Sequence, residues 1–157
     1  MKKTMSRIAA ILCVILLTLA PVSAHAEQLP EAGSEEFFEM RMLIARVIER
    51  TLPERASYIA RLGLADIIIN RTQDARFPDD IRSVVYERGE FECVAREDFL
   101  RTRPSYLSLA AARDALLGCD VTSGAVYFRA ARRAEVPDGC FYHSGYVFER
   151  EIVNTEQ

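Results

Sequence analysis

The stretch ALLGCDVTSGAVYF, residues 115–128, is where the sequence pattern changes from helical to extended. The alanine- and leucine-rich run predicts a helix over about 105–117, and Gly118 is a natural stop because glycine adopts the left-handed conformation that ends many helices. Ser144 and Gly145 suit a turn between two strands. The runs that favour strands are at residues 125–128, 140–142 and 146–148. A helical body with a small β element near the C-terminus predicts an α+β fold.

Two long helices are predicted upstream of this stretch. The first begins near Ser34, a good N-cap residue that is followed by an acidic first turn. Its apolar residues recur at helical spacing until Pro53, which breaks the pattern and suits the start of a second helix running to about Arg71. The isoleucines at 67–69 make this second helix apolar on every side, so we expect it to be central and buried.

Two short elements lie between the second helix and the stretch at 115–128. Asp79 or Asp80 can cap a helix over 81–86, which Gly89 ends. Residues 91–94 favour a short strand.

The first 26 residues have the pattern of an export signal. A basic start is followed by an apolar run at 8–20, which is too short to span a bilayer comfortably, and by the small-residue site Ala24-His25-Ala26. We therefore assign 1–26 to an export signal peptide, 27–36 to a flexible lead and 37–151 to one domain. The expected location is extracellular or associated with the cell wall.

The charge of the chain excludes some partners. Without residues 1–26 the chain has 17 basic and 23 acidic residues, a net charge of −6, and every basic residue is arginine. An acidic domain lacks the basic surface that nucleic acids and anionic lipids require. We therefore expect no nucleic-acid partner and no membrane contact beyond the signal segment. The oligomeric state is left open.

Three cysteines, Cys93, Cys119 and Cys140, remain after the signal. In an exported protein this odd number predicts one disulfide and a free thiol, or an intermolecular bond. The favoured bridge is Cys119 with Cys140 or, alternatively, Cys93 with Cys119. The cysteines and His143 could also form a zinc site, but only the Cys140–His143 spacing is typical of one, so the disulfide is favoured and no metal is expected. A Cys–His nucleophile would also need His143, and structural cysteines are the simpler interpretation.

Four glutamates are candidates for acid catalysis: Glu49, Glu54, Glu90 and Glu92. Cleavage of a glycosidic bond needs a carboxylic acid that is held protonated, so that it can protonate the leaving oxygen. The alternative for each glutamate is an ordinary solvated surface acid.

Taken together, the ordered motifs resemble the SleB/CwlJ-type cell wall hydrolases over about residues 42–150. The segments that carry the resemblance are IARVI at 44–48, ADIIINR at 65–71, RFPDDI at 76–81 with VVY at 84–86, GEF at 89–91, and ALLGCDVTSGAVYF at 115–128. The last is the most specific, because a helix end, an Asp-x-Thr turn and an aromatic strand follow one another in fixed register.

The resemblance implies a small lysozyme-like domain that cleaves the glycan strands of peptidoglycan, as a hydrolase or lytic transglycosylase, through one essential glutamate. It implies no metal or organic cofactor. The candidate general acids are then Glu54, Glu49 and Glu90. The residues expected to bind substrate are Asn70, Phe91, Asp120, Thr122, Tyr127 and Phe128. The alternative for these six is core packing and turn capping.

The chain departs from the family at the catalytic position. Counting from Ala45-Arg46 places the family's glutamate at Thr51, and counting back from Asn70-Arg71 places it at Leu52. Neither residue is an acid. An active enzyme with a relocated acid and a catalytically degenerate module that binds the wall or a partner are therefore both hypotheses. A purely structural exported domain is the third.

Overall fold

The computed structural model describes residues 29–151, so the proposed export signal lies outside the described residues. Its helices are α2 (Glu35–Thr51), α3 (Tyr58–Thr72), α4 (Ile81–Tyr86) and α5 (Tyr106–Leu116). Its short 3₁₀ helices are η1 (Glu92–Ala95), η2 (Phe99–Arg101) and η3 (Arg133–Glu135). Its strands are β1 (Tyr127–Ala130), β2 (Phe141–His143) and β3 (Tyr146–Glu149). The α+β prediction is confirmed.

Serine side chains begin the three long helices. Ser34, Ser57 and Ser105 each accept a hydrogen bond from a backbone N–H in the first turn of α2, α3 and α5, respectively. The predicted start of the second helix at Pro53 is therefore wrong. Residues 53–56 instead form a turn, closed by a 2.8 Å hydrogen bond from Ala56 N to the Pro53 carbonyl, and α3 begins only after the Ser57 cap.

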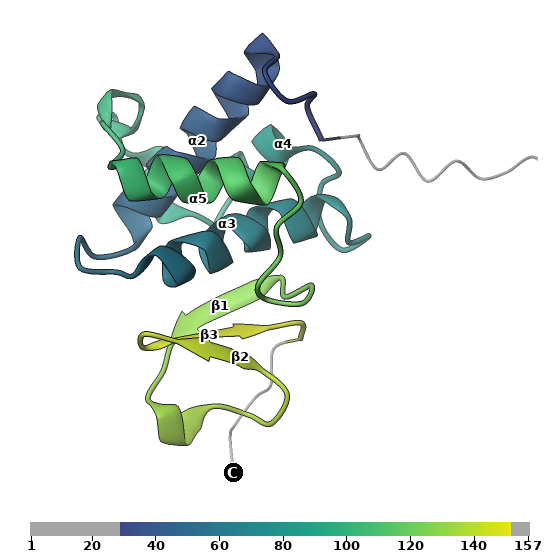
Figure 1. Ribbon diagram of the computed structural model, residues 1–157, viewed down its shortest axis with the longest axis vertical. Helices are drawn as coiled ribbons and strands as arrows, with labels where there is room; N and C mark the ends of the chain where they lie inside the picture. The colour runs from purple at the N-terminus through teal and green to yellow at the C-terminus, as the bar shows by residue number, and fades with distance from the viewer. Residues whose placement is uncertain (1–28, 152–157) are drawn as a thin grey trace, which may run out of the picture.

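Helix α3 is the centre of the fold. It packs against α2, α4 and α5, and the sheet lies along its other side (Figure 1). Almost all of its residues are buried, and Ile67 and Ile68 are fully inaccessible to solvent. The prediction of a central helix is confirmed. Within residues 29–151, no helix has the length and apolar character needed to cross a bilayer.

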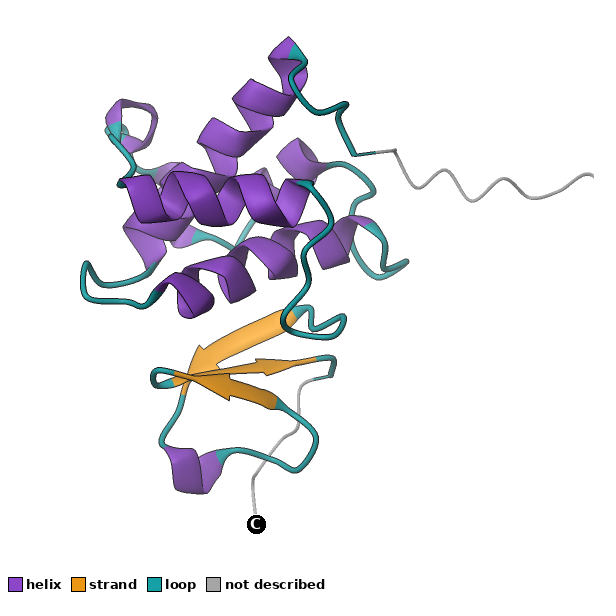
Figure 2. Ribbon diagram, in the orientation of Figure 1, coloured by secondary structure: helices purple, strands orange, loops and turns teal. Residues whose placement is uncertain are grey.

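The three strands form an antiparallel sheet in the order β1-β3-β2 (Figure 2). Ser144 (φ 50°) and Gly145 (φ 88°) form the two-residue turn between β2 and β3, as predicted. Strand β1 begins two residues later than predicted, at Tyr127. The Ala125 and Val126 carbonyls before it accept hydrogen bonds from α3 side chains instead of from a neighbouring strand.

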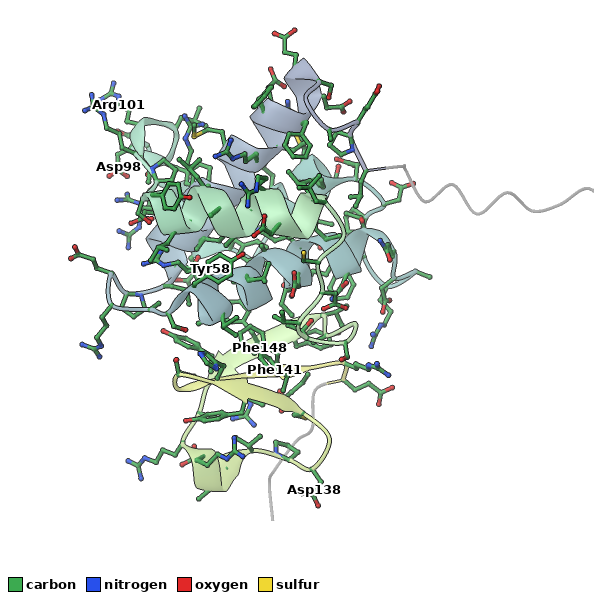
Figure 3. The ribbon with its side chains drawn as sticks, in the orientation of Figure 1. Tyr58, Asp98, Arg101, Asp138, Phe141 and Phe148 are labelled. Carbon is green, nitrogen blue, oxygen red and sulfur yellow. The ribbon has the colours of Figure 1, made fainter. Side chains whose placement is uncertain are left out.

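The sheet is attached to α3 by a close contact between Gly63 and Phe148. A Cβ at Gly63 would lie 2.8 Å from the Phe148 ring, so glycine is the residue that lets this ring approach the helix. Figure 3 shows Phe148 and Phe141 between the sheet and the helices, and their ring centroids are 5.6 Å apart. The sheet therefore has a fixed position against the helical body.

The strand predicted at 91–94 is wrong, because these residues enter the 3₁₀ helix η1. The Val94 N–H donates to the Phe91 carbonyl, 3.2 Å away, so the segment satisfies its backbone locally. The apolar residues of this segment are buried even though they form no strand. Phe91 and Cys93 face the core, whereas the neighbouring Glu90 and Glu92 are exposed.

Candidate functional site

A polar cavity of about 400 Å³ lies where the C-terminal end of α2 meets the segment that leads into η1. The residues that line it are Arg50, Thr51, Gly89, Glu90, Glu92, Cys93 and Arg96. It therefore brings together two of the four candidate acids and one of the two positions at which the catalytic glutamate was expected.

Thr51 is the last residue of α2 and lines this cavity. Its hydroxyl oxygen lies 3.8 Å from the Cys93 sulfur. Leu52 is 5% exposed and does not line the cavity. Of the two positions obtained by counting, Thr51 is thus the one that faces the cavity, and it carries no carboxyl group.

Glu90 lines the cavity and forms an ion pair with the buried Arg71. Glu90 Oε2 lies 2.7 Å from Arg71 Nη1, although the pair lacks the alignment of a linear hydrogen bond and Nη1 has no other partner. The Glu90 side chain is about one-third exposed and that of Arg71 is 4% exposed. Glu90 thus balances a charge that the fold has removed from water.

Arg71 itself is held by aromatic rings and a backbone carbonyl. Its guanidinium carbon lies 4.7 Å from the ring centroid of Phe77, 5.5 Å from that of Phe91 and 5.9 Å from that of Tyr127. Its Nε donates a 2.8 Å hydrogen bond to the Val126 carbonyl. Phe91 and Tyr127, which were expected to bind substrate, are thereby placed around an arginine. Phe128 packs against Phe148 in the sheet.

Glu92 and Arg96 also line the cavity and differ from their charged neighbours there. Arg50 is paired with Asp98 at 2.5 Å, and Glu90 with Arg71. Within residues 29–151, neither Glu92 nor Arg96 has an ion-pair partner, and Glu92 is exposed to solvent. Glu92 is therefore the carboxylate in the cavity that no internal partner holds.

Glu49 does not line the cavity, and its side chain binds the start of α5 instead. Its Oε2 accepts hydrogen bonds from Ser105 N (2.9 Å), Ser105 Oγ (2.8 Å) and Ser108 Oγ (2.7 Å) at the start of α5. Partial burial alone would raise the pKa of Glu49. The hydrogen bonds from both serines and the charge of Arg61 outweigh it and hold this pKa below its ordinary value. A carboxylate held in this way is poorly suited to donate a proton.

Glu54 lies on the exposed turn between α2 and α3 and does not line the cavity. What the fold uses is its backbone carbonyl, which accepts a 2.9 Å hydrogen bond from the buried Arg61. Of the three predicted acids, the structure brings only Glu90 into the cavity.

Asn70, Asp120 and Thr122 hold the turn before β1 against α3. Asn70 Nδ2 donates to Thr122 Oγ1 (3.2 Å) and to the Ala125 carbonyl (3.0 Å). Asp120 accepts from the Thr122 N–H and hydroxyl, each at 2.8 Å, and from the Gly124 N–H at 2.7 Å. All three make the turn-capping contacts that were the alternative to substrate binding.

The comparisons with known proteins agree with this fold. A family model described as Cell Wall Hydrolase matches residues 55–151. This chain belongs to the Cell Wall Hydrolase family. The match begins after α2, so Arg50 and Thr51, one side of the cavity, precede the matched residues.

Curated relatives of the Cell Wall Hydrolase domain are spore cortex-lytic enzymes. The one from Halalkalibacterium halodurans is 34% identical over 71 residues, which are 45% of this chain and 21% of the relative. The one from Bacillus cereus is 32% identical over 71 residues, 45% of this chain and 27% of the relative. The matched part of the chain thus spans about a quarter or less of the length of these relatives.

Two solved structures share the fold of the Cell Wall Hydrolase domain. The catalytic domain of the Bacillus cereus SleB protein has a TM-score of 0.62 and 22% identity, covering 78% of this chain and 95% of that one. The catalytic domain of the germination-specific lytic transglycosylase SleB from Bacillus anthracis has a TM-score of 0.60 and 21% identity, covering 76% and 98%. The expected resemblance to this family and fold is confirmed.

The disulfide expected for the Cell Wall Hydrolase domain is absent from the described residues, where Cys93, Cys119 and Cys140 are free. The three thiols lie in separate places: Cys93 is buried in η1, Cys119 is exposed after α5, and Cys140 is half-buried before β2. Burial raises the pKa of the Cys93 thiol, which disfavours a nucleophilic thiolate. No group of three metal-binding side chains is gathered within residues 29–151.

Sequence reasoning missed Asp66, a buried carboxyl group in α3 of the Cell Wall Hydrolase domain. Asp66 is 1% exposed; its Oδ2 accepts a 2.8 Å hydrogen bond from the Val121 N–H, and its Oδ1 has no partner. Burial, aided by the charge of Asp120, raises the pKa of Asp66 to about 7, although backbone hydrogen bonds oppose the rise. Its position inside the otherwise apolar run 64–69 was the signal in the sequence.

This raised pKa predicts a pH-dependent effect of Asp66→Asn. The folded state holds a proton that the unfolded state releases near pH 3.8, so the wild-type protein loses stability as the pH rises from about 4 to about 7. We expect D66N and wild type to have similar free energies of unfolding near pH 4, and D66N to be more stable above pH 7 by on the order of 4 kcal/mol. Urea unfolding at a series of pH values measures this difference, and a constant difference across the series would contradict it.

Proposed function

We propose that this Cell Wall Hydrolase domain is an exported enzyme that cleaves the glycan strands of peptidoglycan in the cavity at the end of α2. The observation that carries the proposal is the pair Glu90 and Glu92 in one cavity, which Thr51 also lines. Family membership supports the substrate class, and the signal-like pattern of residues 1–26 supports export.

In this proposal the two carboxyl groups have different roles. Glu92 is the single general acid: it gives its proton to the glycosidic oxygen while the bond from that oxygen to the sugar carbon breaks. Glu90, whose carboxylate pairs with Arg71, stabilises the positive charge that develops on the sugar ring.

The second half of the reaction restores Glu92. Its carboxylate takes a proton from the group that attacks the sugar carbon. If that group is water, the product has a reducing end, as in a hydrolase. If it is a hydroxyl of the same sugar, the product is an anhydro sugar, as in a lytic transglycosylase.

A second candidate function is binding of the wall without cleavage. It is favoured by Thr51, a residue without a carboxyl group at the place where counting along the chain puts the family's glutamate. In that case the cavity would retain a glycan strand but cut no bond.

A digest distinguishes the two functions. The purified protein is incubated with spore cortex and with vegetative peptidoglycan, and the soluble fragments are analysed by mass spectrometry while the pellet is tested for bound protein. We expect fragments with reducing or anhydro ends from at least one wall. Protein in the pellet without fragments in the supernatant would support the binding module and overturn the enzymatic proposal.

A further inference from the structure

Arg71 is a buried arginine with partners in several parts of the structure. It lies at the end of the central helix and is 3% exposed. One side of its guanidinium group bonds to the Val126 carbonyl just before β1, and the other side faces Glu90 in the cavity wall. It thus connects the central helix to the residue before β1 and, through Glu90, to the wall of the cavity.

The aromatic rings around Arg71 restrict how it can move. Phe77 comes from the loop after α3, Phe91 precedes η1, and Tyr127 opens β1; all three ring centroids are within 5.9 Å of the guanidinium carbon. Phe77 and Tyr127 also contact each other edge to face, with centroids 5.8 Å apart. A planar guanidinium held by rings and by a carbonyl has one orientation, and that orientation directs Nη1 toward Glu90.

Glu90 is the only group that balances this buried charge within the described residues. Arg71 Nη1 lies 2.7 Å from Glu90 Oε2 and has no other hydrogen-bond partner. Moving the Glu90 carboxylate away would leave a desolvated cation without compensation, which is costly. Glu90 is therefore held at the cavity wall by the charge behind it.

We propose that Arg71 is a positioning residue that fixes the Glu90 carboxylate in the cavity and links its place to that of the C-terminal sheet. The role rests on the proposed function, because positioning matters for cleavage only if cleavage occurs there. Arg71 does not touch the cavity itself, since it is absent from the residues that line it. It acts through Glu90.

The test compares Arg71→Met and Arg71→Lys with a matched control, Arg76→Met. Arg76 is exposed and stacks on the same two rings, at 6.0 Å from Phe77 and 5.7 Å from Tyr127, but pairs with Asp74 instead of Glu90. The full-length protein is used, and each variant is first checked for cooperative urea unfolding. Lysine keeps the charge but cannot bond to Val126 and face Glu90 at the same time.

We expect R71M to lower kcat for fragment release by about tenfold or more with a smaller change in KM, and R71K to recover part of the loss. In an E90Q background the R71M effect should largely disappear, since both changes remove the same interaction. R76M should behave as wild type. An R71M loss that is as large in the E90Q background as in the wild type would overturn the proposal.

A readout that needs no activity separates this proposal from the proposed function. The same four proteins (wild type, R71M, E90Q and the double variant) form a cycle of unfolding free energies. A coupling free energy between Arg71 and Glu90, without fragment release from any wall, would support the contact between these two side chains. It would overturn the proposed cleavage and, with it, the positioning role. No coupling, with release intact in R71M, would overturn the positioning role alone.

Discussion

Glu92→Gln is expected to lower the rate of glycan-fragment release from peptidoglycan by about 100-fold or more, the range over which general acids contribute. The amide has nearly the same shape as the acid but cannot donate the proton that the leaving oxygen needs. Glu92 lines the cavity and has no ion-pair partner among residues 29–151, so the substitution leaves no buried charge without its partner there. Binding to peptidoglycan, measured by co-sedimentation, should therefore be retained.

Three further variants make this result specific. Glu97→Gln, an exposed acid outside the cavity set, serves as the matched control and should release fragments at the wild-type rate. Glu49→Gln and Glu54→Gln test the acids that lie outside the cavity. If either of these abolishes release while E92Q leaves it intact, the assignment of the general acid is wrong.

Arg61→Met is expected to destabilise the protein by about 3–5 kcal/mol, the usual result of breaking a buried charged network by removing one partner. Arg61 is 1% exposed and donates to Ser108 Oγ at 2.7 Å. It also donates to the carbonyls of Pro53, Glu54 and Ala56, which together form the turn between α2 and α3. Methionine fills much of the volume but leaves these acceptors and the Glu49 carboxylate, 3.5 Å from Nη1, without a cation.

Urea unfolding of R61M and R61K at neutral pH measures this effect. Arg82→Met is the control, because Arg82 is exposed and its ion pair with Glu39 lies on the surface, where such pairs contribute little. We expect R61K to lie between R61M and wild type. A loss of less than about 1 kcal/mol in R61M would show that the turn does not depend on Arg61.

The helices could be predicted from the sequence because their signals are local. Ser34 marks a helix start through the hydrogen bond that its side chain accepts, and Gly118 marks a helix end through its left-handed backbone. The apolar run at 67–69 marks the buried helix. The start of α3 was missed because Pro53 suits a helix start as well as a turn. The turn is favoured because the side chain of Arg61, in α3, donates hydrogen bonds to the Pro53 and Glu54 carbonyls.

The candidate site could be predicted only in part, because its side chains are held by partners that lie far away in the sequence. Glu49 and Glu90 were both candidate acids from the sequence, yet Glu49 is bound by Ser105, 56 residues away. Arg71 is oriented by Val126, 55 residues away. Such long-range partners leave no periodic signal, so the sequence named the acids but could not rank them. The prediction of a disulfide within the domain was wrong, because an odd number of cysteines does not reveal where each thiol lies.

The most direct test of the central claim, that the cavity at the end of α2 binds the bond to be cut, is a crystal structure of E92Q with a peptidoglycan tetrasaccharide. The cleavage-deficient variant should retain the intact ligand. The account predicts a glycosidic oxygen within hydrogen-bond distance of the side chain at position 92, with the Glu90 carboxylate beside the same sugar ring. The account would be contradicted if the tetrasaccharide bound elsewhere, such as in the groove beside Phe38 and Leu100, and the cavity at the end of α2 were empty.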